Sequence, residues 1–302
     1  MSTSVTVASP AKINLQLGVG PARPDGFHTL ATVYQAIGLY DEVTVTPAVA
    51  TTLTVVGEGV DVVDVPTDAS NLAVRAAALL AERKGVDDRV AISIRKRIPV
   101  MGGMAGGSTD GAAALLACDT LWGLGTPQEE LLGLAAELGS DVPFCLVGHT
   151  AGGSGRGELV HEVEDAGSYW WVVALSEQGL STPAVFREFD RRHAGGAVPE
   201  PEVSAELLAA LAEGDPVRLG AALLNDLEAP ALSLRPDLAA LLDLGGRPPA
   251  LGALLSGSGP TCLFLAADET DALKIRDGLR DAGTTALVAR GPVPGAHVVP
   301  SL

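Results

Sequence analysis

A glycine-rich segment at residues 99–111, PVMGGMAGGSTDG, constrains the fold of this chain more than any other stretch. It follows an alternating apolar run at 90–95, which is typical of a strand, and it precedes an apolar run at 111–124, which is typical of a helix. Glycines let backbone N–H groups approach a phosphate closely, and the first turn of a helix adds unpaired N–H donors. Strand, loop and helix in this order predict an anion-binding loop, with a flexible turn between two core elements as the alternative.

This loop departs from the two commonest phosphate-binding patterns. It contains neither the G-x-x-x-x-G-K-[ST] of a Walker loop nor the G-x-G-x-x-G that opens a dinucleotide-binding fold. We expect Ser108 or Thr109 to cap the following helix and to place a hydroxyl near bound phosphates or their metal ion. Arg95, Lys96 and Arg97 precede the loop, where they either supply positive charge to an anion or form a solvated strand end.

The composition indicates a globular chain of about two domains, and we place their division between 1–160 and 161–302. The net charge of −17 argues against nucleic acid and anionic membranes as partners, because both require a basic surface. An uncharged stretch at 248–267 contains SGSGP, which would break a membrane helix, and the first residues lack the pattern of a signal peptide. The three cysteines are widely spaced in apolar contexts, so we expect buried free thiols and a cytoplasmic protein.

The first strand is predicted by apolar residues that alternate from Ile13 to Val19. Period two places Lys12 and Asn14 together on the other face of that strand. This face is either exposed to solvent or aimed into a site. A turn predicted at 21–26 is followed by Phe27 and His28. The histidine either contacts the edge of a base or has a structural role.

Asp141 follows the helix expected at 128–138 and precedes the apolar run FCLVG. A carboxylate in this place is either a cap or turn residue, which position alone slightly favours, or a buried functional acid. A second glycine-rich segment, at 148–158, is a weak signal and fits a loop between strands. Other periodic stretches predict a mixed sheet and several helices. The expected elements are strands at 30–39, 42–46, 51–56 and 169–175, and helices at 71–84, 204–213, 216–227, 236–244 and 268–281.

Three separate motifs together resemble those of the GHMP kinases. They are PAKINLQL near the N-terminus, the central glycine-rich segment, and SGSGPTCLFL near the C-terminus. Further stretches, including GSDVPF and NDLE, are similar to the members of this family that phosphorylate a cytidine diphosphate alcohol in non-mevalonate isoprenoid precursor biosynthesis. The resemblance implies an α+β, two-domain fold, with an N-terminal domain like ribosomal protein S5 and a smaller α+β C-terminal domain.

The resemblance also implies roles for individual residues. Lys12 and Asp141 match the catalytic pair of the family, and Asn14 and His28 match substrate contacts, with His28 on the edge of the cytosine. Two aromatic residues match those that enclose the cytosine ring: Phe27, where tyrosine is common, and Phe186. ATP is expected along the central segment, with Mg²⁺ arriving on ATP and Ser108 as its possible protein ligand. The residues expected to contact ATP are Pro99, Val100, Met101, Gly102, Gly103, Met104, Ala105, Gly106, Gly107, Ser108 and Thr109.

Three other functions remain open from the sequence. Another small-molecule kinase of the same family, such as one acting on homoserine, would share the loop but would not need two aromatic residues around a base. A non-catalytic nucleotide-binding protein on the same fold would not need both Lys12 and Asp141. A plain anion-binding domain would carry these residues incidentally. In each case the expected partners are small molecules, and the sequence predicts no oligomeric state.

Overall fold

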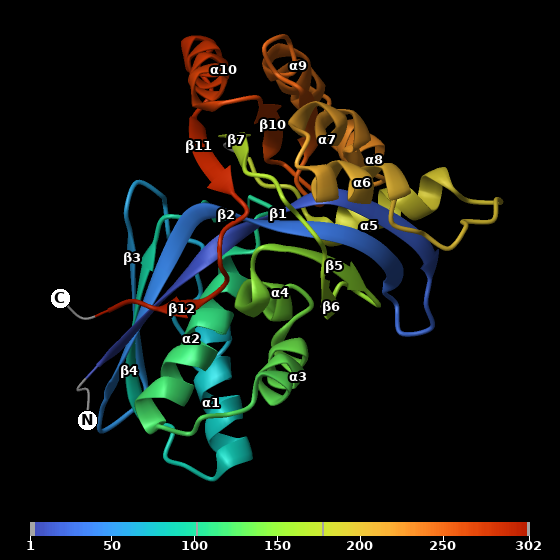
Figure 1. The fold of residues 1–302 in the computed structure, drawn as a ribbon. Helices are drawn as coiled ribbons and strands as arrows, with labels where there is room; N and C mark the ends of the chain where they lie inside the picture. The colour runs from blue at the N-terminus through green and yellow to red at the C-terminus, as the bar shows by residue number, and fades with distance from the viewer. Residues whose placement is uncertain (1–3, 101, 177, 301–302) are drawn as a thin grey trace.

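The computed structural model describes residues 4–100, 102–176 and 178–300, which form two sheets with helices on their outer faces (Figure 1). The larger sheet has eight strands in the order β12-β1-β2-β4-β3, with β5 beside β2, β6 beside β5 and β8 beside β1. Its strands are β1 (Val5–Ala22), β2 (His28–Pro47), β3 (Thr52–Gly57), β4 (Val90–Lys96), β5 (Thr150–Ser154), β6 (Leu159–Glu162), β8 (Leu224–Asn225) and β12 (His297–Val298). The predicted mixed sheet is confirmed, because β3–β4 and β1–β8 are parallel and the other pairs are antiparallel.

Strands β1 and β2 are the two longest strands and form one antiparallel pair. The two strands predicted at 30–39 and 42–46 are in fact one, so the predicted break at Tyr40 and Asp41 is wrong. The pairing shifts register at this point, from Pro10 opposite Tyr40 to Ala11 opposite Ile37. Such a bulge bends a strand and increases its twist without ending it, so the polar residues mark a bend.

The smaller sheet has four antiparallel strands in the order β11-β7-β10-β9. These are β7 (Tyr169–Ala174), β9 (Gly252–Leu255), β10 (Cys262–Ala266) and β11 (Ala286–Gly291). The helices that pack on it are α5 (Thr182–Arg192), α6 (Ala205–Glu213), α7 (Pro216–Ala222), α8 (Glu228–Leu234), α9 (Asp237–Gly245) and α10 (Glu269–Asp281). The helix predicted at 216–227 is too long, because Asn225 leaves it to pair with β1 and donates hydrogen bonds to the carbonyls of Leu255 and Gly257.

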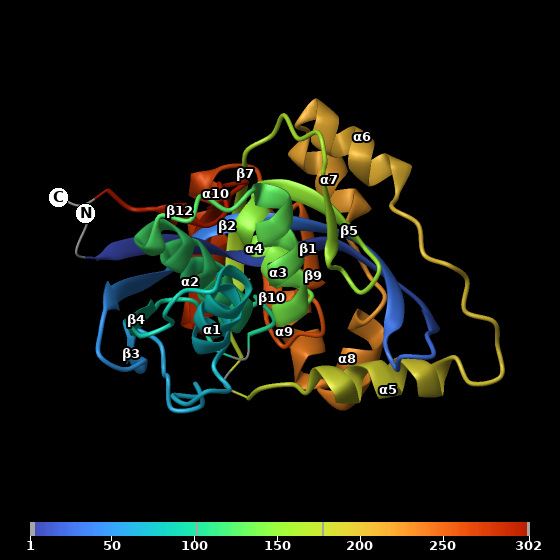
Figure 2. The ribbon, with the colours of Figure 1, turned by 90° about the horizontal axis from the view of Figure 1, so that it is seen from below.

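Four further helices cover the large sheet, as the view from below shows (Figure 2). They are α1 (Leu72–Lys84), α2 (Gly106–Trp122), α3 (Gln128–Leu138) and α4 (Val142–Val147). Helix α1 begins and ends as predicted, since the side chain of Asn71 accepts from the N–H of Ala73 and Gly85 ends the helix in the left-handed conformation. The predicted helix at 128–138 is also confirmed.

Three large apolar cores hold these layers together, and a smaller one joins Tyr34, Ala36, Phe144 and Ala151. The first lies between α1–α4 and one face of the large sheet, the second between the two sheets, and the third between the small sheet and its outer helices. The second core contains Ile13 and Leu15 from β1 together with Trp171 from β7. Because the small sheet covers this face of β1, the alternate residues Lys12 and Asn14 point to its other face.

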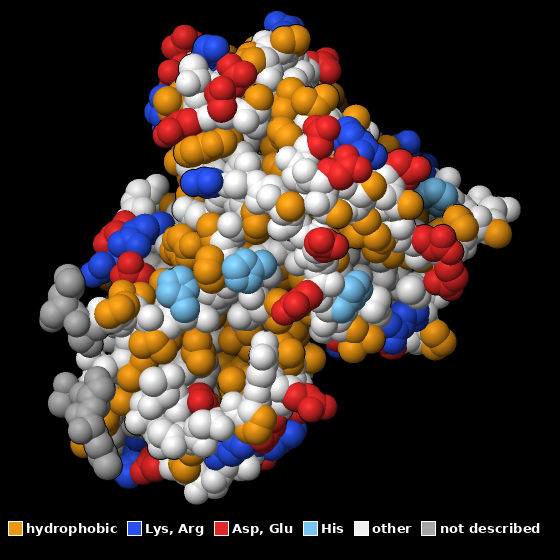
Figure 3. Space-filling model, viewed as in Figure 1, with side chains coloured by type: hydrophobic (Ala, Val, Ile, Leu, Met, Phe, Trp, Pro, Cys, Tyr) orange, Lys and Arg blue, Asp and Glu red, His pale blue; other side chains and the backbone are white. Residues whose placement is uncertain are grey.

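The division predicted between residues 160 and 161 falls within β6 and stays a prediction. Strands β8 and β12, from the C-terminal part of the chain, join the large sheet. Cys118, Cys145 and Cys262 are buried free thiols, as predicted. Within the described ranges, no helix is long and apolar enough to cross a membrane. On the face drawn in Figure 3, Lys and Arg side chains are interspersed with Asp and Glu.

Candidate active site

A cavity of about 370 Å³ lies where β1, the glycine-rich loop and the starts of α4 and α5 meet. It brings together eight of the residues singled out in the sequence: Lys12, Asn14, Phe27, His28, Gly103, Ala105, Asp141 and Phe186. Sequence reasoning did not name the other lining residues, which are Leu17, Leu30, Tyr34, Ser140, Arg156, Thr182, Leu227, Gly257 and Ser258. Of these, Gly257 and Ser258 belong to the SGSGP motif, so the motif could have identified them.

Lys12 and Asn14 lie at the floor of this cavity and not on a solvated strand face. The Lys12 side chain is only 8% exposed, and its Nζ donates to Asn14 Oδ1 at 2.8 Å. Asn14 in turn donates to the hydroxyl of Thr32 at 2.8 Å, and Thr32 donates to the carbonyl of Gln16. This chain of bonds holds the Asn14 amide in one orientation, with its oxygen toward Lys12.

Asp141 occupies the residue before α4, but its side chain makes no capping hydrogen bond to that helix. Its carboxylate instead faces Lys12, with Oδ2 3.6 Å from Nζ. The carboxyl side chain is one-third exposed and lines the cavity. Asp141 is therefore the turn residue that position slightly favoured, but its side chain does not cap the helix, and the arrangement pairs a buried cation with an acid that a ligand can reach.

Tyr34 lies beside this pair and was not predicted. Its hydroxyl donates to Asp141 Oδ1 at 3.4 Å, and the Lys12 Nζ lies 5.3 Å from the ring centroid. Burial, followed by the nearby Asp141 carboxylate, raises the pKa of Tyr34 well above its usual 10. The phenol is therefore neutral at physiological pH and can act as a donor.

The glycine-rich loop is held between β1 and the loop that follows β9. Lys12 N–H donates to the carbonyl of Met104, and the Ser256 hydroxyl donates to the carbonyl of Gly103. Gly103 has a φ of +71°, and a Cβ there would lie 2.7 Å from the carbonyl oxygen of Ser256. Glycine is required at this position both by its backbone conformation and by the close approach.

Helix α2 begins earlier than expected, so the predicted cap is wrong. Ala105 is the N-cap, with a φ of 59° and no side-chain cap bond, and Gly106 is the first helical residue. Thr109 is already in the first turn, where its buried hydroxyl donates to the carbonyl of Pro10. Gly106 and Gly107 leave this first turn uncovered by side chains, which keeps its N–H donors open to an anion.

A second cavity, of about 240 Å³, lies on the other side of this helix start. Gly106, Gly107 and Val100 line it from the predicted ATP segment, and Asn71 lines it from the start of α1. Pro99 and Val100 also line a third cavity. Met101 lies outside the described residues. The predicted ATP segment therefore runs between two cavities, with Lys12 and Asp141 in the first of them.

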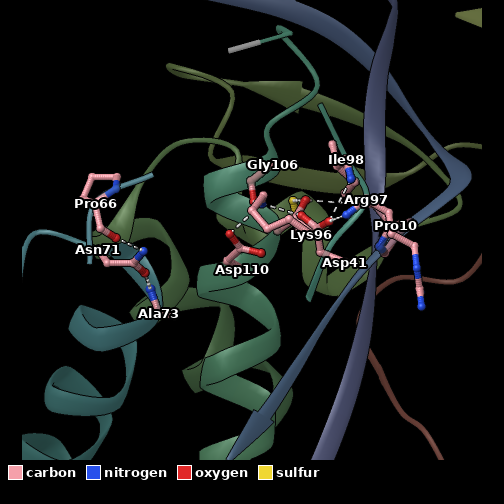
Figure 4. Close-up of polar contacts among 12 residues, drawn as sticks. Pro10, Asp41, Pro66, Asn71, Ala73, Lys96, Arg97, Ile98, Gly106 and Asp110 are labelled. Carbon is pink, nitrogen blue, oxygen red and sulfur yellow. Dashed lines mark hydrogen bonds and ion pairs between the residues drawn. The ribbon is translucent and has the colours of Figure 1, made fainter. Parts of the chain in front are cut away.

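The three basic residues before the loop are all paired within the protein. Lys96 is 2% exposed and forms ion pairs with Asp41 at 2.5 Å and Asp110 at 2.7 Å, while donating to the carbonyl of Gly106 (Figure 4). Burial opposes the charge on Lys96, but the two carboxylates outweigh it and raise the lysine pKa. Burial raises the pKa of Asp110 to about 8, against the opposing charge of Lys96. Lys96 is thus neither a solvated strand end nor a free anion ligand.

Arg95 and Arg97 are paired on the surface of the same strand end. Both contact the carboxylates of Glu42 and Glu58. In the part of the chain that the structure describes, no group of three or more His, Cys, Asp and Glu side chains is placed to hold a metal ion.

The outer end of the first cavity carries the predicted aromatic residues. The His28 ring stacks on Phe186 with centroids 5.0 Å apart, and its Nε2 lies 2.8 Å from Asp190 Oδ1. Phe27 is 49% exposed, and the Arg156 guanidinium lies over its ring at 4.8 Å. One face of Phe186 is thus in contact with His28 and one face of Phe27 with Arg156, and one nitrogen of His28 is already engaged by Asp190.

Comparisons with known proteins define the class of this fold and site. Residues 71–149 match the GHMP kinases N terminal domain, and residues 207–285 match the GHMP kinases C terminal domain. The chain belongs to the GHMP kinase family, which confirms the predicted α+β fold.

Within that family, two similar relatives carry the same name. The chain is 56% identical to the 4-diphosphocytidyl-2-C-methyl-D-erythritol kinase of Streptomyces avermitilis, across 98% of this chain and 100% of the relative. It is 55% identical to the enzyme of the same name from Thermobifida fusca, across 98% and 99%. A crystal structure of 4-(cytidine 5'-diphospho)-2C-methyl-D-erythritol kinase matches with a TM-score of 0.77 at 33% identity, covering 94% of this chain and 98% of that one.

Proposed function

We propose that the chain is an ATP-dependent kinase that phosphorylates the 2-hydroxyl of 4-diphosphocytidyl-2-C-methyl-D-erythritol, a step in non-mevalonate isoprenoid precursor biosynthesis. The observation that carries this proposal is a single cavity with the Lys12–Asp141 pair beside an anion-binding helix start and with aromatic rings at its outer end. The names of the relatives, at more than 50% identity over nearly the whole chain, support the same substrate.

The chemistry follows from the placement of the pair. The substrate hydroxyl oxygen forms a bond to the γ-phosphorus, the bond from that phosphorus to the β–γ bridging oxygen breaks, and ADP leaves. Asp141 accepts the hydroxyl proton as the attack proceeds. Lys12 stabilises the negative charge that develops around the transferring group, and Asn14 holds the ammonium in place.

The phosphates of ATP are proposed to lie at the start of α2. There the first-turn N–H groups and the helix dipole favour an anion, and Gly106 and Gly107 allow close approach. Mg²⁺ reaches kinases on ATP and keeps phosphate and water ligands, so a site without a carboxylate cluster is compatible with it. Ser108, partly exposed in the same turn, would hold the ion, which would neutralise charge on the phosphates.

One experiment tests the proposal as a whole. The purified protein is incubated with ATP, Mg²⁺ and separate alcohols, and ADP release is followed. The panel contains 4-diphosphocytidyl-2-C-methyl-D-erythritol, its uridine counterpart, homoserine and mevalonate. We expect turnover chiefly with the cytidine compound. Preferential turnover of homoserine or mevalonate would leave the family assignment intact and overturn the substrate.

Substitution of Gly107 by valine is expected to weaken ATP binding by about tenfold or more, which corresponds to about 1.4 kcal/mol. The valine side chain would project into the second cavity beside the helix start, where a Cβ would lie 3.9 Å from Leu72 Cδ1 and otherwise meet open space. Calorimetry with ATP measures the effect. Gly133→Val, on the open face of α3, is the matched control for a β-branched residue in a helix. Equal ATP affinity in folded Gly107→Val protein would contradict the placement of the phosphates.

The substitutions Phe27→Ala and His28→Ala are expected to raise KM for the cytidine substrate far more than KM for ATP. Stacking on an aromatic ring contributes about 1–3 kcal/mol per base in single-strand binders, and this scale is borrowed for Phe27. His28→Ala should also reduce the preference for cytosine over uracil, because a polar contact left unmade is what rejects the wrong base. Steady-state kinetics with the cytidine substrate and with its uridine counterpart measure both effects. A change in the KM for ATP alone would contradict the roles given to Phe27 and His28.

A further inference from the structure

The glycine-rich segment at 148–158 has no role in the proposal so far, yet its glycines surround the ring of Tyr34. This segment forms β5 and the turn that leads into β6, and Tyr34 pairs with Ala151 across the β2–β5 ladder. A Cβ on Gly153 would lie 2.6 Å from Tyr34 Cε2. A Cβ on Gly157, whose φ is +104°, would lie 2.2 Å from the Tyr34 hydroxyl oxygen. The hairpin can therefore enclose this side chain only because these two residues are glycine.

The other side of the ring is also fixed. Phe144 of α4 packs on Tyr34 with ring centroids 4.9 Å apart, and the tyrosine is 2% exposed. Helix α4 is the helix that Asp141 precedes, so the same packing that holds the tyrosine also sets the start of α4. With its ring held from both sides, the hydroxyl has one position, which faces Asp141 Oδ1.

We propose that Tyr34 is a positioning residue for phosphoryl transfer, which acts by holding the Asp141 carboxylate in the orientation that receives the substrate proton. This inference rests on the proposed function, in which Asp141 is the base. Oδ1 is held by the phenol and Oδ2 faces Lys12, so each carboxylate oxygen has a partner. Without the phenol, the carboxylate could rotate about its bond to Cβ, and misplacement on the order of 1 Å can cost about 10²-fold in rate.

The length of the contact fits this role. At 3.4 Å, the Tyr34–Asp141 contact is at the long end for an O–H···O hydrogen bond. Catalytic hydrogen bonds of this kind tighten in the Michaelis complex. The neutral, buried phenol keeps its proton and so remains a donor while Asp141 changes its charge.

The first variant is Tyr34→Phe, which keeps the ring and removes the hydroxyl. We expect kcat to fall by about tenfold or more, with KM for ATP within about twofold of wild type, because the hydroxyl orients the base and does not touch ATP. A purely structural role would instead lower the melting temperature and leave kcat per folded molecule unchanged. Tyr34→Phe with kcat within about twofold of wild type would overturn the inference.

The second test moves the hydroxyl without removing it. Gly157→Ala should lower kcat, because the new methyl group meets the phenol oxygen. Gly155→Ala is the control for an alanine at positive φ: it lies in the same turn with a φ of +71°, but its Cβ would meet the flexible Glu158 side chain and not Tyr34. When Tyr34 is already replaced by phenylalanine, Gly157→Ala should lower kcat no further than Gly155→Ala does, because the hydroxyl oxygen that the new methyl group would displace is absent.

The outcomes separate this inference from the proposed function. If the wild type prefers another alcohol of the panel and Tyr34→Phe lowers kcat with that alcohol, the substrate proposal fails and the inference stands. If the cytidine compound is phosphorylated and Gly157→Ala behaves like Gly155→Ala in both backgrounds, the inference fails and the proposed function stands. If no alcohol is turned over, both fail.

Discussion

Replacing Asp141 with asparagine is expected to lower kcat by about 10²–10⁴-fold, the range that a positioned general base contributes. Asparagine has the shape of aspartate, so the start of α4 and the packing of Phe144 should be preserved. What is lost is the ability to accept a proton from the substrate hydroxyl, together with the charge that faces Lys12 at 3.6 Å. Steady-state ADP release measures the effect, and calorimetry should show ATP affinity close to that of the wild type.

A matched control for this variant is Asp119→Asn. Asp119 is an aspartate of the same N-terminal half, but it is buried on α2 and accepts a hydrogen bond from the N–H of Thr126, away from the cavity. Its substitution should leave kcat almost unchanged. An Asp141→Asn variant that retains more than about a tenth of the wild-type kcat would show that Asp141 is not the base.

Local sequence signals predict the elements that are determined locally. Asn71 and Gly85 set the ends of α1 through one capping bond and one left-handed residue, and both are legible in the sequence. The predicted start of α2 is wrong because Ala105 adopts a left-handed conformation that alanine rarely takes. Residue propensities do not predict this conformation of Ala105, because the tertiary contacts of the loop impose it.

The site is also predictable only in part, because tertiary contacts bring some of its residues together. The sequence singles out Lys12, Asn14 and Asp141, and the structure brings them together as the resemblance implies. Tyr34 escapes prediction because it reaches Asp141 only through the register that pairs it with Asn14 across β1 and β2. That register depends on bulges, and hydrophobic periodicity does not reveal them.

Lys96 shows that buried charged residues are also hard to predict from the sequence. A charged residue in an alternating strand is normally solvated, so a buried lysine cannot be recognised without knowing its partners. Asp41 comes from a predicted turn and Asp110 from a loop end, and the three residues meet only when β2, β4 and α2 pack together (Figure 4). This cluster supports the helix start directly, because Lys96 also donates to the carbonyl of Gly106.

The last prediction concerns this cluster: Lys96→Met should destabilise the folded protein by about 3–5 kcal/mol, as expected when one partner of a buried ion pair is removed. Methionine fills a similar volume but leaves the Asp41 carboxylate without its cation. Urea unfolding followed by circular dichroism measures the loss. Arg95→Met, one residue earlier in the same strand, is the control: its side chain is 53% exposed, and removing exposed ion pairs costs about 0–1 kcal/mol.

The variant Asp110→Asn keeps the shape of the Asp110 side chain and removes its ionisable group, so it tests the effect of charge apart from that of packing. Because burial raises the pKa of Asp110 to about 8, this carboxyl keeps its proton in the folded protein well above pH 4, but an amide of the same shape should change stability little only below about pH 4, where the unfolded carboxyl is protonated as well. The folded pKa lies above the unfolded value of 3.8, so the folded wild type binds the extra proton, and this stabilisation is lost as the pH rises to about 8. The asparagine variant has no proton to lose and should gain stability relative to the wild type as the pH rises from about 4 to about 8. A wild-type stability that rises over this range relative to Asp110→Asn, or a Lys96→Met variant as stable as Arg95→Met, would contradict the account of a buried lysine shared by one charged and one protonated carboxyl.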